Sequence, residues 1–490
     1  MANFLKKRWV MILVAVLITA TVVGLSIYRD SMTKMLDKAE YSDLSNAFKE
    51  SAEEGYFTSQ SSLQEFITKW ADDIDLEYKI DKAGNIIFSK DATERKKKIS
   101  PTVVCVSYNY ETARENARLL AGAAMIARAD ITSGSRTVIF VNDEQNNGDG
   151  YKHLSKKFFK RKAKVIYLDY GSSAYISNSS FGKKNSEISI KAGRYEPECD
   201  TAVKVHISGI DTGVIGTGIS KHPDPVSALG TLLARLKSKS AIFQLADFEV
   251  GTNGNMYPVS IDATIMLNSY NVSSFTKYID KRIKAWEKAY SKDYEELTYT
   301  YEVIDDPEKL PTESYSRKAT ARLANVLYTL QSGLYKYEES DDIPEGREAG
   351  DICGINAITG LHAEDGYIYV DIMTQAYNDT YMDRIMSDNT ASAELFDCKL
   401  SETSSVPRFL NEKDSLKRTL ISTHYKLNSS SSSGGTLKSD FDNYFTPCSY
   451  LAAKNENADV IHLRLDPENS SSMINTIICY IAYKGNNFLI

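Results

Sequence analysis

The chain has 490 residues, of which 42% are hydrophobic and 25% charged, so most of it is expected to fold into globular domains rather than stay disordered. Its length indicates more than one domain. The formal net charge of −7 argues against a nucleic-acid-binding protein, because the phosphate backbone requires a basic surface. The chain has six histidines, so a histidine-rich metal site is also difficult to build.

The N-terminal region predicts a membrane anchor. Three basic residues at 6–8 precede residues 9–27, which contain no charged side chain. At about 1.5 Å per residue, a helix of this length can cross a bilayer. The length also favours a retained single-pass anchor over a cleaved signal peptide. The basic cluster predicts a cytoplasmic tail at residues 1–8 and an extracellular location for the bulk of the chain.

Two amphipathic segments follow the predicted anchor. Residues 28–55 are mostly polar, with Met35, Leu36 and Ala39 on one helical face, and are expected to form a helical stalk. Residues 61–71 have the apolar spacing of a second helix. The globular part of the chain is therefore expected to begin near residue 56.

Strands and helices then alternate. Apolar segments at 103–107, 137–141 and 165–168 are predicted strands, and 113–129 and 151–162 are predicted helices. Strands that are apolar throughout, separated by helices, favour a mostly parallel sheet covered on both faces. This pattern predicts an α/β domain.

The segment 201–311 has a different pattern, in the order strand, helix, strand, strand, helix, strand. That order is typical of a ferredoxin-like α+β unit. We therefore expect a small domain inserted into a larger α/β domain that comprises residues 56–200 and 312–490. The second part contains predicted strands at 367–373, 420–427 and 460–465.

Several motifs occur in the order in which one known family carries them. The sequence DKAGNII at 81–87 predicts a hairpin, and TVIFVNDEQ at 137–145 predicts a strand that ends in acidic and amide residues. The inserted unit follows, and SGGT occurs at 433–436, within a Ser/Gly run that is otherwise typical of a surface loop. Over roughly residues 60–490 the chain thus resembles the zinc exopeptidases of the aminoacyl-histidine dipeptidase, tripeptidase and aminoacylase type. A sister group of zinc aminopeptidases lacks the inserted lid.

The resemblance implies a site for two zinc ions, held by two histidines and three carboxylates, with a further carboxylate as general base. The first strand of the family ends in a ligand histidine and an aspartate that orients it. Here Ser107 and Asn109 stand at those two positions. Both are neutral side chains, which bind a dication poorly.

Three acidic residues match the remaining positions. The resemblance assigns Glu115 to the bridging carboxylate, Glu144 to the base and Asp169 to a further ligand, while Gln145 replaces a ligand glutamate. In a shifted register the acidic pair is Asp143 and Glu144 instead. Without the resemblance, each acid can equally be read as a helix first-turn residue or a solvated turn residue.

No histidine stands at a ligand position. Residues 465–468, where the last ligand is expected, contain none, and the arginine that binds the substrate carboxylate is missing from residues 373–376. His222 lies in the inserted domain near the place of a substrate-binding histidine, although its surroundings also read as the turn into a helix. His462 is expected to be packed or exposed on a strand.

These substitutions predict a membrane-anchored, metallopeptidase-like pseudoenzyme without a metal cofactor, which binds a peptide-like ligand or a protein partner. The alternative is an active metallohydrolase, a peptidase or deacylase, in which Glu115, Glu144 and Asp169 hold zinc or manganese. A third possibility is a structural envelope protein with a filled cleft. By resemblance, the inserted domain also predicts a homodimer.

Overall fold

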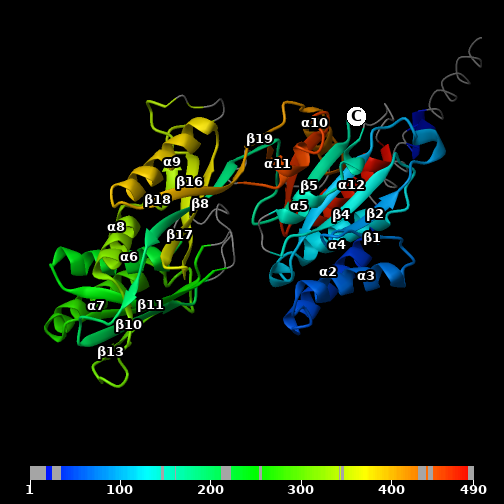
Figure 1. Ribbon diagram of the computed structural model, residues 1–490. Coiled ribbons are helices and arrows are strands. Elements are labelled where there is room, and N and C mark those ends of the chain that lie inside the picture. The colour runs from blue at the N-terminus through cyan, green and yellow to red at the C-terminus, as the bar shows by residue number, and fades with distance from the viewer. Residues whose placement is uncertain are drawn as a thin grey trace, which may run out of the picture.

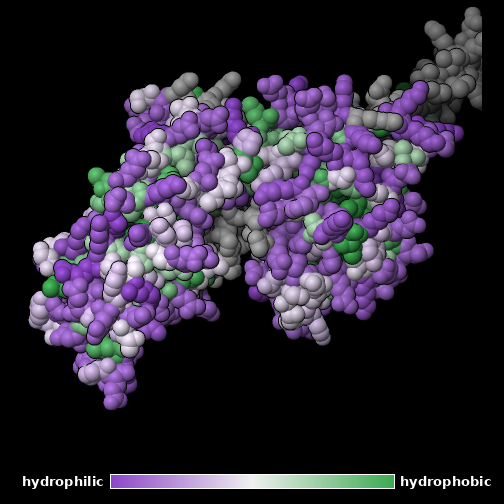
Figure 2. Space-filling view, in the orientation of Figure 1, coloured by the Kyte–Doolittle hydropathy of each residue, from purple (hydrophilic) through white to green (hydrophobic). Residues whose placement is uncertain are grey.

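The structure of the chain is a computed structural model. The chain forms two lobes that lie side by side, one built from the N- and C-terminal parts and one from the middle of the sequence (Figure 1). Hydrophilic residues cover most of the visible face of both lobes, and hydrophobic residues form small separate groups (Figure 2). The structure describes residues 18–21, 23–24, 35–144, 148–160, 162–210, 222–252, 257–341, 343, 347–428, 438–439 and 445–483.

The first lobe is built on an eight-stranded sheet with the order β1-β2-β4-β3-β5-β21-β6-β20. The central strands β4, β3, β5 and β21 are parallel, as the sequence predicts. Their carboxyl ends therefore meet at one edge of the sheet. The strands are β1 (Lys79–Ile80), β2 (Ile86–Lys90), β3 (Thr102–Tyr108), β4 (Arg136–Asn142), β5 (Lys164–Tyr170), β6 (Tyr175–Ser177), β20 (Lys438–Ser439) and β21 (Asp459–Leu465).

Helices cover both faces of this sheet, which is why its strands are apolar on both sides. In β3, Val104 and Val106 face a core shared with α2, α3, α4 and α12, while Val103 and Cys105 face a second core beneath α5 and α11. The helices of this lobe are α2 (Lys38–Glu53), α3 (Gln60–Asp73), α4 (Ala117–Arg128), α5 (Asp149–His153), α10 (Ser415–Asn428), α11 (Cys448–Ala452) and α12 (Ser470–Tyr483).

Residues 36–53 are part of the first lobe and not of a free stalk. Tyr41, Leu44 and Phe48 of α2 are buried in the larger core, where the Phe48 ring lies 4.8 Å from that of Phe66. The side chain of Asp37 caps the helix by accepting hydrogen bonds from the first backbone amides. The mostly polar composition of the segment suggested a stalk, but a narrow apolar stripe on α2 packs against α4.

The predicted membrane span at residues 9–27 lies mostly outside the described residues. Within the part of the chain that the structure describes, none of the helices combines the length and the apolar character that a bilayer crossing requires.

The second lobe contains the predicted ferredoxin-like unit. Its elements follow in the order strand, helix, strand, strand, helix, strand, and the strands form an antiparallel sheet with the order β11-β12-β10-β13. The elements are β10 (Thr201–Ser208), α6 (Pro225–Ser238), β11 (Phe243–Gly251), β12 (Ser260–Leu267), α7 (Ser269–Tyr290) and β13 (Thr298–Ile304).

The inserted lobe is larger than the predicted range 201–311. A second antiparallel sheet, with the order β15-β16-β17-β8-β18, shares one hydrophobic core with the ferredoxin-like unit. The strand predicted at 367–373 belongs to this sheet and not to the sheet of the first lobe. The sequence did not reveal this, because an apolar strand pattern does not show which sheet a strand joins. The elements are β8 (Gly182–Lys191), α8 (Arg317–Thr329), β15 (Gly333–Lys336), β16 (Ile352–Glu364), β17 (Tyr367–Ala376), α9 (Asp379–Glu394) and β18 (Lys399–Val406).

The segment predicted as a strand at 420–427 lies in helix α10 instead. Its buried residues Leu416, Leu420, His424 and Leu427 have helical spacing, which places them on one face. The remaining short elements include two strand pairs and three 3₁₀ turns. They are β7 (Ser179–Ser180), β9 (Arg194–Tyr195), β14 (Ser314–Tyr315), β19 (Phe409–Leu410), η1 (Glu94–Lys96), η2 (Tyr110–Thr112) and η3 (Lys156–Phe159).

Two neighbouring segments connect the lobes. The chain leaves the first lobe through β7 into β8 and returns from β18 through β19, and these segments pair with each other in antiparallel register. Phe409 pairs with Ser180, and Val406 pairs with Lys183. The connection is therefore a two-stranded ribbon (Figure 1).

We expect Phe48→Ala to lower the free energy of unfolding of the first lobe by about 3–5 kcal/mol, because it removes a fully buried ring from the core. The control is Tyr56→Ala, since Tyr56 is 64% exposed. This substitution should lower the free energy of unfolding by less than about 0.5 kcal/mol. Urea unfolding followed by circular dichroism measures both. Equal stabilities of the two variants would mean that α2 does not pack against the lobe in solution.

Candidate functional site

Polar side chains gather at the carboxyl edge of the first-lobe sheet, where β3, β4, β5 and β21 end. Ser107 is the second-last residue of β3, and Asp143 directly follows β4. Asp169 and Arg464 lie opposite each other near the ends of β5 and β21. Ligands of open α/β sheets commonly bind at this edge. We call Ser107, Asp143, Asp169, His462 and Arg464, with Lys183 from β8, the edge cluster.

Asp143 is buried and hydrogen-bonded at both carboxylate oxygens. Its Oδ1 accepts from the amide of Gly148 at 2.8 Å, and its Oδ2 accepts from Ser107 Oγ at 3.4 Å. Gly148 has a φ of 77°, which lets the loop turn back towards the strand. Ser107 Oγ also lies 2.9 Å from the hydroxyl of the buried Tyr151. Burial raises the pKa of Asp143, and its hydrogen bonds and the charge of Lys183 oppose this increase in part.

Asn109 holds the loop after β4 in place. Its Nδ2 donates to the carbonyl oxygens of Asp143 at 3.3 Å and of Glu144 at 3.0 Å. Its Oδ1 accepts from the amide of Glu111 at 2.9 Å and caps the short helix η2. An aspartate cannot donate these two bonds. At the position where the resemblance expects an aspartate that orients a metal ligand, the chain thus has a residue with a structural role.

Asp169 is paired with a cation from the neighbouring strand. Its Oδ2 accepts from Arg464 Nη2 at 2.7 Å and from Nε at 3.1 Å, while its Oδ1 accepts from the amide of Tyr170 at 2.8 Å. His462 Nε2 lies 3.4 Å from the same Oδ2. Burial acts to raise the pKa of Asp169, but Arg464 and His462 outweigh it and lower the pKa below the usual range.

His462 and Arg464 were not predicted as site residues. They are two residues apart on β21, so their side chains point to the same face of the sheet. His462 is completely buried, and its ring centroid lies 5.1 Å from that of Tyr167 and 5.5 Å from that of Tyr175. The signal in the sequence was the alternation of two basic residues with apolar ones in a strand at the predicted site edge.

Lys183 adds a second cation, and it comes from the second lobe. It is 3% exposed, and its Nζ lies 4.5 Å from the centroid of the Phe445 ring. Burial lowers the pKa of Lys183 to about 8, while the charge of Asp143 opposes this decrease. Sequence reasoning missed Lys183, because no pattern placed the start of β8 beside the loop after β4.

The three acids predicted as metal ligands are not brought together. Glu115 and Glu144 are exposed, whereas Asp169 is partly buried against Arg464. Among the residues that the structure describes, no three His, Cys, Asp or Glu side chains gather closely enough to hold a metal ion. Gln145 and the SGGT motif at 433–436 lie outside the described residues.

The donors of the edge cluster and of the neighbouring Asn109 do not fit a pair of zinc ions. Ser107 offers a hydroxyl, and Asn109 already uses its amide to hold backbone groups. The carboxylate of Asp169 is engaged by a guanidinium, so a metal ion there would meet a fixed positive charge. The residues present neutralise one another without a metal.

His222 makes its contacts within the second lobe. Its Nδ1 is 2.8 Å from the hydroxyl of Tyr294, and its ring centroid lies 4.2 Å from that of Tyr257. Burial lowers the pKa of His222 to about 4, so the imidazole is neutral near pH 7. With Arg282 and Trp286 it lines a pocket of about 380 Å³. His222 is therefore placed to offer a neutral ring nitrogen there.

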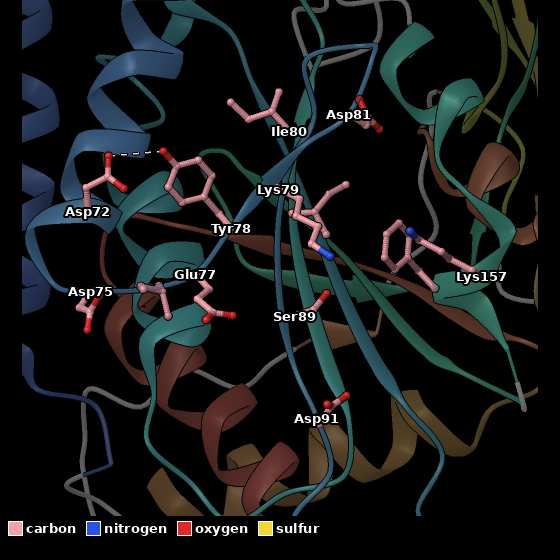
Figure 3. A pocket seen from close by; sticks show the side chains of 13 residues that line it. Asp72, Asp75, Glu77, Tyr78, Lys79, Ile80, Asp81, Ser89, Asp91 and Lys157 are labelled. Atoms are coloured by element: carbon pink, nitrogen blue, oxygen red, sulfur yellow. Dashed lines mark hydrogen bonds between the residues drawn. The ribbon is translucent and has the colours of Figure 1, made fainter.

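A concavity of about 850 Å³ lies elsewhere on the first lobe, around the edge strand β1 (Figure 3). Acidic side chains line much of it, and the hydroxyl of Tyr78 donates to Asp72 Oδ2 at 3.4 Å. It shares no residue with the edge cluster. The size of a cavity therefore does not identify the predicted site in this chain.

No family model matches the sequence, and no curated protein matches it. Among solved structures, aminoacylhistidine dipeptidase from Vibrio alginolyticus is similar, with 13% identity and a TM-score of 0.56 over 92% of this chain and 97% of that chain. A tripeptidase from Staphylococcus aureus has 9% identity and a TM-score of 0.45, over 92% of this chain and 99% of that one. The first similarity shows that this chain shares the fold of the dipeptidase.

We expect Asp169→Asn to lower the free energy of unfolding by about 2–4 kcal/mol at pH 7, because it leaves Arg464 without its charge partner in a partly buried site. The control is Glu144→Gln, which should change it by less than about 0.5 kcal/mol, since Glu144 is exposed to solvent. Urea titration at pH 7 compares the two variants. Equal losses would contradict the assignment of Asp169 as the paired charge.

The pH dependence should follow the same pair. Because the pKa of Asp169 is lowered in the fold, its contribution to stability is present above the usual value of 3.8 and is lost as the pH falls below it. The difference between the native protein and Asp169→Asn should therefore shrink steadily below pH 4, which thermal unfolding across a pH series measures. A difference that stays constant would show that the ion pair does not stabilise the fold.

Proposed function

We propose that this chain, which has the fold of aminoacylhistidine dipeptidase, is a membrane-anchored, extracellular binding protein for a peptide-like ligand, and that it does not hydrolyse that ligand. The observation that carries the proposal is the ion pair between Asp169 and Arg464. A carboxylate that would bind a metal ion in a two-zinc site is occupied by a cation of the protein itself.

The second cation supports the same conclusion. Lys183 reaches the edge cluster from β8, and the charge of Asp143 acts on it. Two acids thus have two protein cations near them, Asp169 with Arg464 and Asp143 with Lys183. A divalent ion added to this arrangement would be repelled by both cations, and it would find a hydroxyl at Ser107 in place of an imidazole.

The exposed rim of the site supports a peptide-like ligand. Glu111 and Glu144 are exposed near the end of β3 and the loop after β4, and their charges raise the pKa of Tyr110, with Glu111 the larger cause. In contrast to Asp143 and Asp169, these carboxylates are open to solvent. They can accept hydrogen bonds from the terminal ammonium group and backbone amides of a peptide.

The location outside the cytoplasm rests on residues 1–27. The basic cluster at 6–8 and the uncharged run at 9–27 predict an anchor with a cytoplasmic N-terminus. Such an anchor would hold both lobes near the membrane surface, where a peptide-like ligand or a protein partner is available from outside.

We expect the purified full-length protein to contain far less than one equivalent of zinc or manganese, and to release no product from dipeptides or N-acyl amino acids. Metal analysis by plasma mass spectrometry and a chromatographic hydrolysis assay measure the two properties. Stoichiometric zinc with turnover that Glu144→Gln abolishes, while the neighbouring control Glu111→Gln retains it, would overturn the proposal.

The alternative function is an active metallohydrolase with an altered site. The observation that favours it is the approach of His462 Nε2 to Asp169 Oδ2 at 3.4 Å, because imidazole and carboxylate together are common metal ligands. Arg464 would have to leave Asp169 for an ion to bind. A manganese peak in the anomalous scattering of a soaked crystal, coordinated by Asp169 and His462, would establish this alternative.

By the same resemblance we propose a homodimer formed through the inserted lobe. The strands β11 and β13 are the two edges of its four-stranded sheet, and Val303 of β13 is 38% exposed. Such an edge can pair with a second copy across a two-fold axis. Sedimentation velocity of the full-length protein at micromolar concentration should show a dimer, and Val303→Lys should weaken it. A monomer throughout would remove this part of the proposal.

A further inference from the structure

A second pocket of the inserted lobe lies between the edge strand β15 and helix α9, away from the edge cluster. Its volume is about 570 Å³, within the range of about 300–1,000 Å³ that is typical of small-molecule sites. We call it the tyrosine pocket. The side chains that matter for its chemistry are Tyr335, Tyr337, Glu338, Tyr381, Arg384 and Asp388.

Tyr337 supplies a buried hydroxyl that has no protein partner. Its side chain is 3% exposed, its ring packs edge-on against Tyr381 with a centroid distance of 5.2 Å, and its hydroxyl has no hydrogen-bond partner among the described residues. Buried polar groups are almost always paired, because an unpaired one loses its hydrogen bonds to water. A ligand or a water molecule inside the pocket can therefore supply the missing partner of the Tyr337 hydroxyl.

Tyr335, two residues earlier in β15, shows the same feature. Its hydroxyl is also buried and lacks a hydrogen bond of normal geometry within the described part of the chain. Burial, with the charge of Asp388, raises the pKa of Tyr335 to about 12, so the phenol stays neutral and can both donate and accept. Two such hydroxyls on one wall match a ligand that carries hydroxyl groups itself.

The charges of the pocket cancel. Arg384 Nη2 lies 3.1 Å from Glu338 Oε1, so these two side chains already neutralise each other at the rim. Lys336 and Asp388 also line the pocket, are exposed to solvent, and contribute one positive and one negative charge. An ionic ligand would gain little net attraction here, whereas a neutral ligand can bond to the outer atoms of these groups without separating the ion pair.

We propose that the tyrosine pocket binds a neutral saccharide of one or two sugar units. A sugar presents adjacent hydroxyl groups that donate to carboxylates such as Asp388 and accept from guanidinium groups such as Arg384. The same hydroxyl groups can bond to the phenols of Tyr335 and Tyr337. This site is independent of the peptide-like ligand proposed for the edge cluster.

The experiment is a titration of the purified full-length protein, kept in a detergent without a sugar headgroup, with cellobiose and with N,N′-diacetylchitobiose. Saturation-transfer NMR and calorimetry should detect binding of at least one of them at millimolar concentration. Tyr337→Phe should weaken that binding by about threefold to tenfold, the equivalent of one hydrogen bond. Its melting temperature should not fall, because the hydroxyl that it removes has no protein partner.

The matched control is Tyr328→Phe on α8, since Tyr328 is 68% exposed and lies outside the pocket, and its affinity should equal that of the native protein. Asp388→Asn on the exposed face of α9 provides a second variant that should also weaken binding. The proposal is overturned if neither sugar binds, if Tyr337→Phe and Asp388→Asn bind as tightly as Tyr328→Phe, or if a zwitterionic amino acid such as alanine binds in place of the sugars.

Discussion

The pairing of Asp169 with Arg464 is the constraint on which the predicted site depends. Parallel strands bring their carboxyl ends together, and in this fold the convergence concentrates acidic side chains at one edge of the sheet. Such a concentration is stable only if positive charge compensates it. Here β21 supplies the compensation from within the protein, two residues after it contributes His462.

The neutral residues beside this pair also bond to groups of the protein itself. Asn109 uses its amide to fasten the loop after β4, and Ser107 bonds to Asp143 and Tyr151. Each of these contacts satisfies a buried polar group without any added ion. The polar interior of the edge is thus closed by the chain itself, while Glu111 and Glu144 at its rim remain open to solvent. These contacts are the basis of the proposal that the site binds a ligand without cleaving it.

Much of the fold could be predicted from the sequence, because periodicity reports local structure and burial. The parallel strands were recognisable as apolar runs, and the ferredoxin-like order could be followed element by element. The sheet to which a strand belongs could not be predicted. Strand β17 has the pattern of any half-buried strand, and only its partners β8 and β16 place it in the second lobe. The helix α2 was underestimated because a stripe as narrow as that of Tyr41, Leu44 and Phe48 is enough to bury one face.

The places of several candidate residues in the fold could be predicted from the sequence, but their partners could not. The strand ends located Ser107, Asp143 and Asp169, since those positions follow directly from the strand pattern. The cations could not be located in this way, because Lys183 comes from another lobe, and a basic residue within a strand is usually solvated. Pairing across a sheet depends on register, which for Arg464 and Asp169 becomes visible only once β5 and β21 are neighbours.

The ribbon that joins the lobes has a consequence for motion. Because β7–β8 and β18–β19 run side by side as a single two-stranded band, the inserted lobe can swing about one hinge axis more easily than it can rotate freely or detach. Lys183 stands at the start of that band. The ribbon thus carries a buried ammonium group on which the charge of Asp143 acts, so the path of the ribbon helps to set the charge balance of the edge cluster.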